Sequence, residues 1–235
     1  MNEQFIRTIA LIGENNFNNI QNKTIAVFGL GGVGGTTFES LVRTGFKNFI
    51  IVDFDVVDVS NLNRQILYTL EDINKLKVEA SKQRALKINP NLKIDAFNLK
   101  ISANSMSNFK NLKIDYIIDA IDDLPGKVEI IKFSLENNIP FISSLGMANK
   151  LNSTDVTITK LNKTTTDPLA KKLRYMLKKE NVEIGKVMVA FSSEYPVRKE
   201  RILSSIMMVP SAAGLAISSY VLKVFLEENR NEEHL

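Results

Sequence analysis

The sequence predicts an α/β protein with a Rossmann-like, mainly parallel sheet flanked by helices and an antiparallel extension in the C-terminal third. Short apolar runs alternate with amphipathic segments through the front half, which is typical of βαβ units. A glycine cluster at residues 29–34 separates the first apolar run from the first helical pattern. A chain of 235 residues is long enough for one sizeable domain. We therefore expect a single unit over 1–235, with a core at 20–147 and an elaboration at 148–235.

The front part of the chain contains five predicted strands, over Thr24–Phe28, Phe49–Val52, Lys93–Phe97, Ile114–Ile118 and Pro140–Ser143. A helix follows the glycine cluster and runs to about Arg43, where Gly45 is a candidate C-cap. A second helix extends from about Lys75 to Ile88 and ends there because Asn89-Pro90 disfavours further helix.

The back part of the chain has a different pattern. Alternating residues predict strands over Asp155–Lys160 and Lys186–Phe191, and such alternation favours antiparallel pairing. Asp167-Pro168 between them is a helix start, with an N-cap carboxylate and a proline in the first turn. A final helix is expected over Ala212–Glu228.

The composition excludes several kinds of site. Cysteine is absent, which excludes disulfides, cysteine-ligated zinc and a thiolate nucleophile. The one histidine, His234, lies next to the C-terminus, where it is poorly placed for a Ser-His or Cys-His pair. The net charge of +4 permits an anionic partner without requiring one.

The N-terminus lacks the pattern of a signal peptide, so we expect a cytoplasmic protein. The apolar stretch Ile206–Leu226 contains Pro210, Gly214 and Lys223, which favours a buried core or dimer-interface helix over a membrane span. Phe46, Phe49 and the pair Met207-Met208 are interpreted as core side chains.

The glycine cluster, Gly29-Leu30-Gly31-Gly32-Val33-Gly34, matches G-x-G-x-x-G between a strand and a helix. Its glycines let backbone approach a phosphate, and the helix N-terminus supplies unpaired N–H groups. Asp53 follows about twenty residues later, where an acid can hold ribose hydroxyls. These features indicate an adenine nucleotide, and alone they favour NAD. A tight turn without a ligand is the alternative.

Polar residues after Asp53 favour a triphosphate instead. One loop carries Asp55, Asn61, Asn63, Arg64 and Gln65, Lys77 opens the next helix, and Asp119–Asp123 follow the fourth strand. Loops at the carboxyl ends of parallel strands meet at one sheet edge. There, arginine and lysine can clamp phosphates and Asp122 can hold Mg²⁺, which a nicotinamide cofactor does not need. The alternative is that Arg64 and Lys77 pair with nearby acids on the surface.

At these residues the sequence resembles the ThiF/MoeB/HesA superfamily, the ubiquitin-activating-type adenylyltransferases. The resemblance runs through GLGGVG at 29–34, IVDFDVVDVSNLNRQ at 51–65, LKVEA at 76–80, INP at 88–90 and DYIIDAIDD at 115–123. It implies a ThiF-type nucleotide-binding domain that adenylates a carboxylate with Mg-ATP and releases pyrophosphate. It also implies a homodimer, with residues 148–235 serving substrate and dimer contacts.

The resemblance implies a role for each matching residue. Gly31 and Gly34 would pack against phosphates, and Asp53 would bind the ribose. Asn61, Arg64 and Lys77 would contact the triphosphate around which Arg64, Lys77 and Asp122 converge. Asp122 would bind Mg²⁺ or align the α-phosphate, and Arg7 would reach across the dimer interface as a catalytic finger. The full nucleotide set is Gly29, Gly31, Gly32, Gly34, Asp53, Asp55, Asn61, Arg64, Gln65, Lys77 and Asp122.

The second half is similar to the tRNA-modifying branch of the superfamily, the threonylcarbamoyladenosine dehydratases. The stretches SSLGMANKLNSTDVTITKLNKTTTDPLAKKLRYMLKKENV and VMVAFSSEYPV carry this resemblance. It implies ATP-dependent activation of the threonyl carboxylate of threonylcarbamoyladenosine in ANN-decoding tRNA, then dehydrative cyclisation without an enzyme nucleophile. No zinc is expected, and a monovalent cation is left open. The region 194–208 is shorter than this branch leads us to expect.

The helix that starts at Pro168 carries basic residues, Lys171, Lys172, Arg174 and Lys178. Their spacing places several of them on one face, which can follow an RNA backbone. A solvated helix face is the alternative. For the whole chain the alternatives are an adenylyltransferase for a ubiquitin-like sulfur carrier or a peptide, a non-catalytic nucleotide-binding subunit, and a dehydrogenase.

Overall fold

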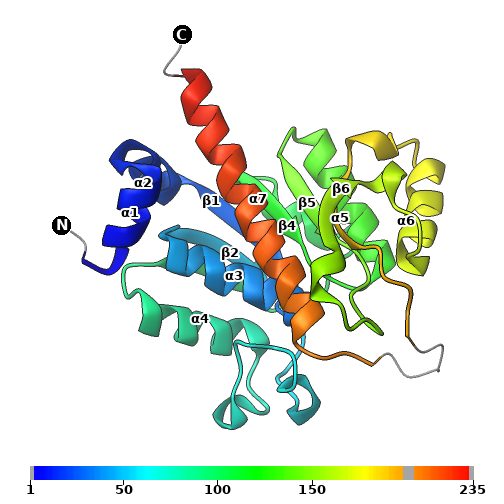
Figure 1. Cartoon of the computed structure of the whole chain (residues 1–235), viewed down its shortest axis with the longest axis horizontal. Helices are drawn as coiled ribbons and strands as arrows, with labels where there is room; N and C mark the ends of the chain where they lie inside the picture. The colour runs from blue at the N-terminus through cyan, green and yellow to red at the C-terminus, as the bar shows by residue number, and fades with distance from the viewer. Residues whose placement is uncertain (1–2, 198–203, 233–235) are drawn as a thin grey trace.

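A computed structural model of the chain describes residues 3–197 and 204–232, and within them seven strands form one sheet of order β3-β2-β1-β4-β5-β7-β6 (Figure 1). The strands are β1 (Thr24–Phe28), β2 (Asn48–Val52), β3 (Lys93–Phe97), β4 (Tyr116–Asp119), β5 (Phe141–Ser144), β6 (Val156–Lys160) and β7 (Met188–Ser192). Every neighbouring pair is parallel except β6 with β7. The predicted fold class is confirmed.

The antiparallel part of the sheet contains fewer strands than predicted. Only β6 at the edge runs against its neighbour, whereas β7 pairs parallel with β5 through Ser143 opposite Val189. The chain leaves β5, forms β6 and returns as β7, so β7 continues the parallel sheet. β4 begins at Tyr116, later than predicted, and just before it the Asp115 carboxylate accepts a hydrogen bond from Thr24 N at 2.7 Å.

In the described part of the chain the α-helices are α1 (Ile6–Ile12), α2 (Glu14–Asn22), α3 (Gly32–Thr44), α4 (Lys77–Ile88), α5 (Leu124–Glu136), α6 (Pro168–Lys179) and α7 (Met208–Glu232). Short 3₁₀ turns lie at Glu3–Phe5, Val59–Asn61, Leu70–Asp72, Ser105–Phe109, Ser153–Asp155, Leu161–Lys163 and Ile184–Lys186. Two predicted caps are confirmed: Gly45 ends α3 in the left-handed region at φ 117°, and the Asp167 carboxylate accepts hydrogen bonds from the first turn of α6. α7 starts at Met208, before the predicted Ala212, because Pro210 is tolerated in a first turn.

The hydrophobic core lies on both faces of the sheet. Side chains of β1 alternate between them, with Ile25 and Val27 on one side and Ala26 and Phe28 on the other. The first face is covered by α2, α3, α4 and α7, and the second by α5 and α6. In Figure 1, α1 and α2 lie at one end of the molecule and α6 at the other.

The apolar character of α7 is explained by its position over the sheet. By length and composition, Met208–Asn229 is the one stretch among the described residues that can cross a membrane. Its side chains at every fourth position are buried in the core: Val209, Ala213, Ile217, Val221 and Phe225. Figure 1 shows α7 crossing the sheet on the side of α3. The prediction that Met207 and Met208 are core residues is wrong, because they precede this stripe and are 38% and 55% exposed.

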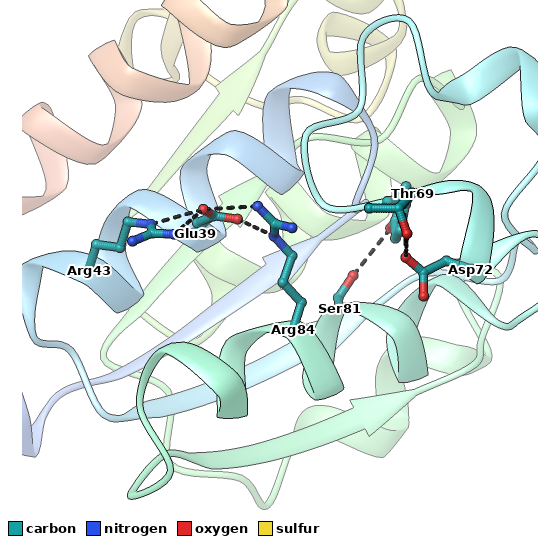
Figure 2. A network of polar contacts seen from close by, with 7 residues as sticks. Glu39, Arg43, Thr69, Asp72, Ser81 and Arg84 are labelled. Atoms are coloured by element: carbon teal, nitrogen blue, oxygen red, sulfur yellow. Dashed lines mark hydrogen bonds and ion pairs between the residues drawn. The ribbon is translucent and has the colours of Figure 1, made fainter.

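Polar contacts hold α4 against α3. The buried Glu39 on α3 accepts hydrogen bonds from Arg43 on the same helix and from Arg84 on α4 (Figure 2). Burial raises the pKa of Glu39, but the two guanidinium groups outweigh that effect and hold the pKa below its ordinary value. In the same view Asp72 closes the turn before α4 through Thr69. The helix that carries Lys77 is thus fixed to the helix that follows the glycine cluster.

The close approach of α7 to α3 gives a test of the fold. Gly214 of α7 has no room for a side chain, because a Cβ there would lie 2.7 Å from Thr36 Cβ and from the Val33 carbonyl oxygen. Gly214→Ala should therefore lower the free energy of unfolding by about 1–3 kcal/mol through overpacking, although alanine is the better helix former. Urea denaturation measures the change. Gly185→Ala, whose Cβ would lie 3.4 Å from the nearest side-chain atom, should shift it by less than about 0.5 kcal/mol.

Candidate functional site

A cavity of about 500 Å³ lies at the carboxyl ends of β1, β2, β4 and β5. Its wall combines the loop after each of these strands with the start of α4 and the start of α6. The predicted residues that line it are Gly29, Gly31, Gly32, Asp53, Asp55, Asn61, Arg64, Gln65, Lys77 and Asp122. Arg64, Lys77 and Asp122 therefore share one cavity with the glycine turn. Gly34 and Arg7 are not among the lining residues.

The glycine turn is shaped by backbone packing. Gly29 adopts a φ of +88°, in the region that favours glycine. A Cβ on Gly34 would lie 1.9 Å from the Gly29 carbonyl oxygen, so Gly34 lets the first turn of α3 pack directly on the turn. At Gly31, by contrast, a Cβ would meet only Gln65 Nε2, at 3.9 Å. Gly34 thus has a packing role, and Gly31 borders open space in the cavity.

Asp53 at the end of β2 ties the glycine turn to the loop after β2. One carboxylate oxygen accepts a hydrogen bond from Leu30 N at 2.7 Å, and the other accepts one from Asp55 N at 2.9 Å. Burial raises the pKa of Asp53, while the Lys77 charge and the two backbone hydrogen bonds act in the opposite direction. Each oxygen keeps a lone pair for a ligand hydroxyl.

Lys77 is buried where α4 begins, and its Nζ forms a 2.7 Å ion pair with Asp55, which is half exposed. Arg64 is held by its own loop: Nη1 donates to the Ser60 carbonyl at 2.7 Å and to Asn63 Oδ1 at 3.0 Å. The alternative was that Arg64 and Lys77 pair with acids on the surface, and it fits neither residue fully. Lys77 does pair with an acid, but in the wall of the cavity, and Arg64 contacts neutral oxygens.

Two amides complete this part of the wall. Asn61 Oδ1 accepts a hydrogen bond from Asp58 N at 3.3 Å, which orders the turn before Arg64. Gln65 is buried, and its Oε1 has no hydrogen-bond partner within the residues that the structure describes. A buried acceptor without a partner, as Gln65 Oε1 is, raises the free energy of the folded protein. A ligand with a hydrogen-bond donor at this position would remove that cost.

Asp122 and Asp123 lie in the loop between β4 and α5, and both line the cavity. Asp123 accepts a hydrogen bond from Gly126 N at 2.8 Å as the N-cap of α5, which leaves Asp122 as the candidate metal ligand. Residues 3–197 and 204–232 hold no group of three acids or histidines able to bind a metal alone. Asp122 stays a predicted ligand of Mg²⁺, which proteins commonly hold with one or two carboxylates together with nucleotide phosphates.

The sequence analysis assigned no role to a buried polar cluster beneath this loop. Lys127 of α5 lies 3.0 Å from Asp119 Oδ1, and the Ser143 hydroxyl donates to Asp119 Oδ2 at 2.6 Å. All three side chains are fully buried, and the Ile121 N–H also donates to Asp119, at 3.3 Å. Burial raises the pKa of Asp119, against the opposing effects of Lys127 and Ser143. The cluster fixes the start of the loop that carries Asp122.

The sequence analysis gave residues 148–235 to substrate and dimer contacts as a region. It singled out no substrate residue in the half of the cavity formed by the loop after β5, residues 145–150, and by the first turn of α6. The Asp167 carboxylate accepts hydrogen bonds from Gly146 N at 2.9 Å and from Leu169 N at 2.7 Å, which joins the loop to the helix. Lys150 closes this end. Its position six residues beyond β5 is a usable sequence signal, because that loop must leave the same sheet edge.

The predicted RNA-binding and dimer residues lie outside the cavity. Lys171, Lys172 and Lys178 are exposed on α6, whereas Arg174 turns inward and donates to the carbonyls of Leu161 and Thr164. Arg7 is exposed on α1, at the end of the molecule away from α6 in Figure 1. The region 194–208 is described only in part, because 198–203 fall outside the described residues. His234 also lies outside them.

Comparison with known proteins matches a model of the ThiF family to residues 4–234. The chain belongs to the ThiF family. Within that family it is similar to the tRNA threonylcarbamoyladenosine dehydratase of Bacillus subtilis (strain 168), at 36% identity over 97% of this chain and 96% of the relative. It is less extensively similar to SUMO-activating enzyme subunit 2 of Dictyostelium discoideum, at 31% identity over 66% of this chain and 23% of the relative.

Solved structures give the same family placement. Crystal structures of Escherichia coli tRNA N6-threonylcarbamoyladenosine dehydratase, in complex with AMP and with ATP, match this ThiF-family chain with a TM-score of 0.92 at 30% identity. The match covers 97% of this chain and 96% of each solved chain. E. coli MccB with ATP, at 17% identity and a TM-score of 0.70, shares the fold.

The buried cluster beneath Asp122 gives a stability prediction. Lys127→Met leaves Asp119 buried without its counter-charge and should cost about 3–5 kcal/mol in the free energy of unfolding. Without Lys127 the folded-state pKa of Asp119 lies further above its unfolded value. Between the unfolded-state pKa and the folded-state pKa of Asp119, the native state binds a proton on Asp119 that the unfolded state does not bind. The free energy of unfolding should therefore fall as the pH rises through this interval and recover as the pH is lowered.

Urea denaturation across a pH series measures both effects. The double variant Lys127→Met/Asp119→Asn, which removes both charges, is the matched control and should regain most of the stability with little pH dependence. A Lys127→Met protein of wild-type stability at neutral pH would contradict the assignment of a charged Asp119–Lys127 pair.

Proposed function

We propose that this chain uses ATP to adenylate the threonyl carboxylate of threonylcarbamoyladenosine in tRNA, and then closes the activated group into a ring. The observation that carries the proposal is the extent of the likeness, because 97% of the chain aligns with dehydratases over nearly their whole length. That alignment includes the back half, whose residues form the second end of the cavity. The likeness to a SUMO-activating subunit covers only 66% of the chain.

The chemistry proceeds in two displacements. A carboxylate oxygen attacks the α-phosphorus of ATP, the bond to the bridging oxygen breaks, and pyrophosphate leaves. The carbamoyl nitrogen then attacks the acyl carbon, loses its proton, and displaces AMP to give a cyclic hydantoin. The substrate loses one water overall. Both nucleophiles belong to the substrate, which agrees with a chain that contains no cysteine.

The protein's contribution is to position the groups and to neutralise charge. Arg64 lies in the loop after β2 and Lys77 opens α4 at the end of that connection, and both line one cavity, where their charges balance the triphosphate and the leaving pyrophosphate. Asp53 receives the ribose hydroxyls, and the amides of the glycine turn face the phosphates. Asp122 would hold Mg²⁺, which supplies further neutralisation of phosphate charge when bound.

The remaining assignments belong to the same proposal. The chain acts as one ThiF-type domain in the cytoplasm and as a homodimer, in which Arg7 reaches the partner's cavity. The exposed position of Arg7 on α1, outside its own cavity, supports that arrangement. The tRNA substrates are of the ANN-decoding class, and a monovalent cation at the interface is left open.

The function is tested by ATP–pyrophosphate exchange with tRNA from cells that lack this protein. Exchange should depend on that tRNA, and mass analysis of its nucleosides should show loss of one water from threonylcarbamoyladenosine. Exchange that responds only to a ubiquitin-like carrier protein would contradict the proposal and favour a carrier-activating enzyme.

The same assay tests the phosphate clamp. Arg64→Ala and Lys77→Ala should each lower exchange about a hundredfold, or about 3 kcal/mol, because each removes one charged contact to the transition state. The fold should persist, since the freed Asp55 is half exposed and can be solvated. Circular dichroism and urea denaturation check this, and near-wild-type exchange in both variants would refute the roles of these two residues.

The exposed basic side chains of α6 give a separate prediction. Lys171→Glu and Lys178→Glu should weaken tRNA binding and lower the slope of log affinity against log salt by about one unit for each phosphate that is no longer neutralised. Lys87→Glu on α4, on the other face of the sheet, is the matched control and should leave the slope unchanged. Filter binding over a salt series measures this. An unchanged slope in the α6 variants would remove this face from the RNA interface.

A further inference from the structure

Lys150 is a buried cation in the wall of the cavity, in the part of the wall that the loop after β5 forms. It lies in the loop after β5, lines the cavity, and is only 4% exposed. Its Nζ donates to the Ser192 carbonyl at 3.0 Å and lies 5.8 Å from the centre of the Phe191 ring. An ammonium has three donors, and a lysine is rarely buried this deeply without an anionic partner.

The carboxylates nearest to Lys150 already accept hydrogen bonds from the backbone. Asp167 accepts from Gly146 N, Leu169 N and Ala170 N, and Glu194 accepts from Leu151 N and Asn152 N. Over residues 3–197 and 204–232, the ion pairs of the structure do not include Lys150. Burial lowers the pKa of Lys150, and the charges of Asp167 and Glu194 only oppose that effect.

The other cations of the cavity are in different situations. Lys77 has its own counter-ion in Asp55, and Arg64 is held by Ser60 and Asn63 in the loop after β2. Lys100 is exposed and lies over the Phe54 ring. Lys150 is therefore the buried cavity cation whose charge is not matched by a carboxylate in the described structure.

A carboxylate that approaches a bound triphosphate is repelled by it, because both are anions. A desolvated cation on the substrate's side of the cavity offsets that repulsion and gives the carboxylate a charge-assisted hydrogen bond. Two carboxylates hold the loop that contains Lys150 in place. Asp167 holds Gly146 so closely that a Cβ there would lie 3.2 Å from its oxygen, and Glu194 holds the backbone just after Lys150.

We propose that Lys150 binds the carboxylate of the substrate and positions it for attack on the α-phosphate. The inference rests on the proposed function, since it names the residue that recognises the group to be adenylated. It assigns the loop after β5 and the start of α6 to the substrate, and the glycine turn and the start of α4 to the nucleotide.

A chemical double-mutant cycle tests the contact. The probes are tRNA carrying threonylcarbamoyladenosine and the same tRNA with the carboxylate converted to its methyl ester, each bound in the presence of a non-hydrolysable ATP analogue. The wild-type protein should bind the acid at least about tenfold more tightly than the ester. In Lys150→Gln that ratio should fall to about two or less, and Lys150→Arg, which keeps the charge, should retain part of it.

Controls separate recognition from folding. Lys87→Gln, the same change on exposed α4, should keep the wild-type ratio, and Lys150→Gln should bind the ATP analogue with wild-type affinity. A wild-type ratio in Lys150→Gln would overturn the proposal, and so would an equal loss of nucleotide and tRNA affinity, which indicates a structural role. If Lys150→Gln does not fold, a Lys150→Arg protein without any preference for the acid overturns it instead.

The wild-type protein distinguishes this inference from the function on which it rests. Turnover of the modified tRNA without any preference for the acid over the ester would overturn the role of Lys150 and leave the proposed function standing. Failure of the wild-type protein to turn over the modified tRNA would overturn the proposed function, and the inference with it.

Discussion

The cavity depends on one residue, Asp53, whose carboxylate and backbone N–H together join three stretches of backbone. Asp53 directly follows β2, and its carboxylate accepts hydrogen bonds from Leu30 in the glycine turn and from Asp55 two residues later, at 2.7 and 2.9 Å. Its own N–H donates to Phe97 at the end of β3. Because Asp55 pairs with Lys77, the same connection continues to the start of α4. The first half of the site is therefore one hydrogen-bonded unit, in which no loop moves without disturbing the next.

That connection explains why sequence reasoning located this half of the cavity. The loops after β1, β2 and β4 are short or rich in turn residues, and parallel strands bring their carboxyl ends to one edge. Local patterns therefore predicted Asp53, Arg64, Lys77 and Asp122 in a common place, and the structure has all four in one cavity wall. The structure also gives Gly34 a packing role, because a Cβ there would lie 1.9 Å from the Gly29 carbonyl oxygen, and a motif does not distinguish this requirement from phosphate contact.

The sequence indicated the second half of the cavity only as a region, and its individual residues escaped prediction because their connections are long-range. Asp167 was predicted as a helix cap, which is a local property, but its bond to Gly146 spans 21 positions. Lys150 and Glu194 are brought together only when β7 inserts beside β5, and a pattern of alternation did not predict that parallel pairing. The prediction for Met207-Met208 was wrong for a different reason, because it relied on composition alone. The pair has the composition of a core, but it stands just before the helical stripe that the core covers.

The two halves of the cavity also differ in how they use charge. In the nucleotide half, acids and bases neutralise one another, as Lys77 and Asp55 do, and a triphosphate has to compete for Lys77. In the other half Asp167 and Glu194 are satisfied by backbone N–H groups, so Lys150 keeps its charge for a ligand. The loop that contains Lys150 is held by Asp167 and Glu194, which lie on other segments than those joined by Asp53. The substrate can therefore change through residues 145–150, Asp167 and Glu194 while the hydrogen bonds around Asp53 stay intact. This is one physical reason why members of a single fold can activate different carboxylates.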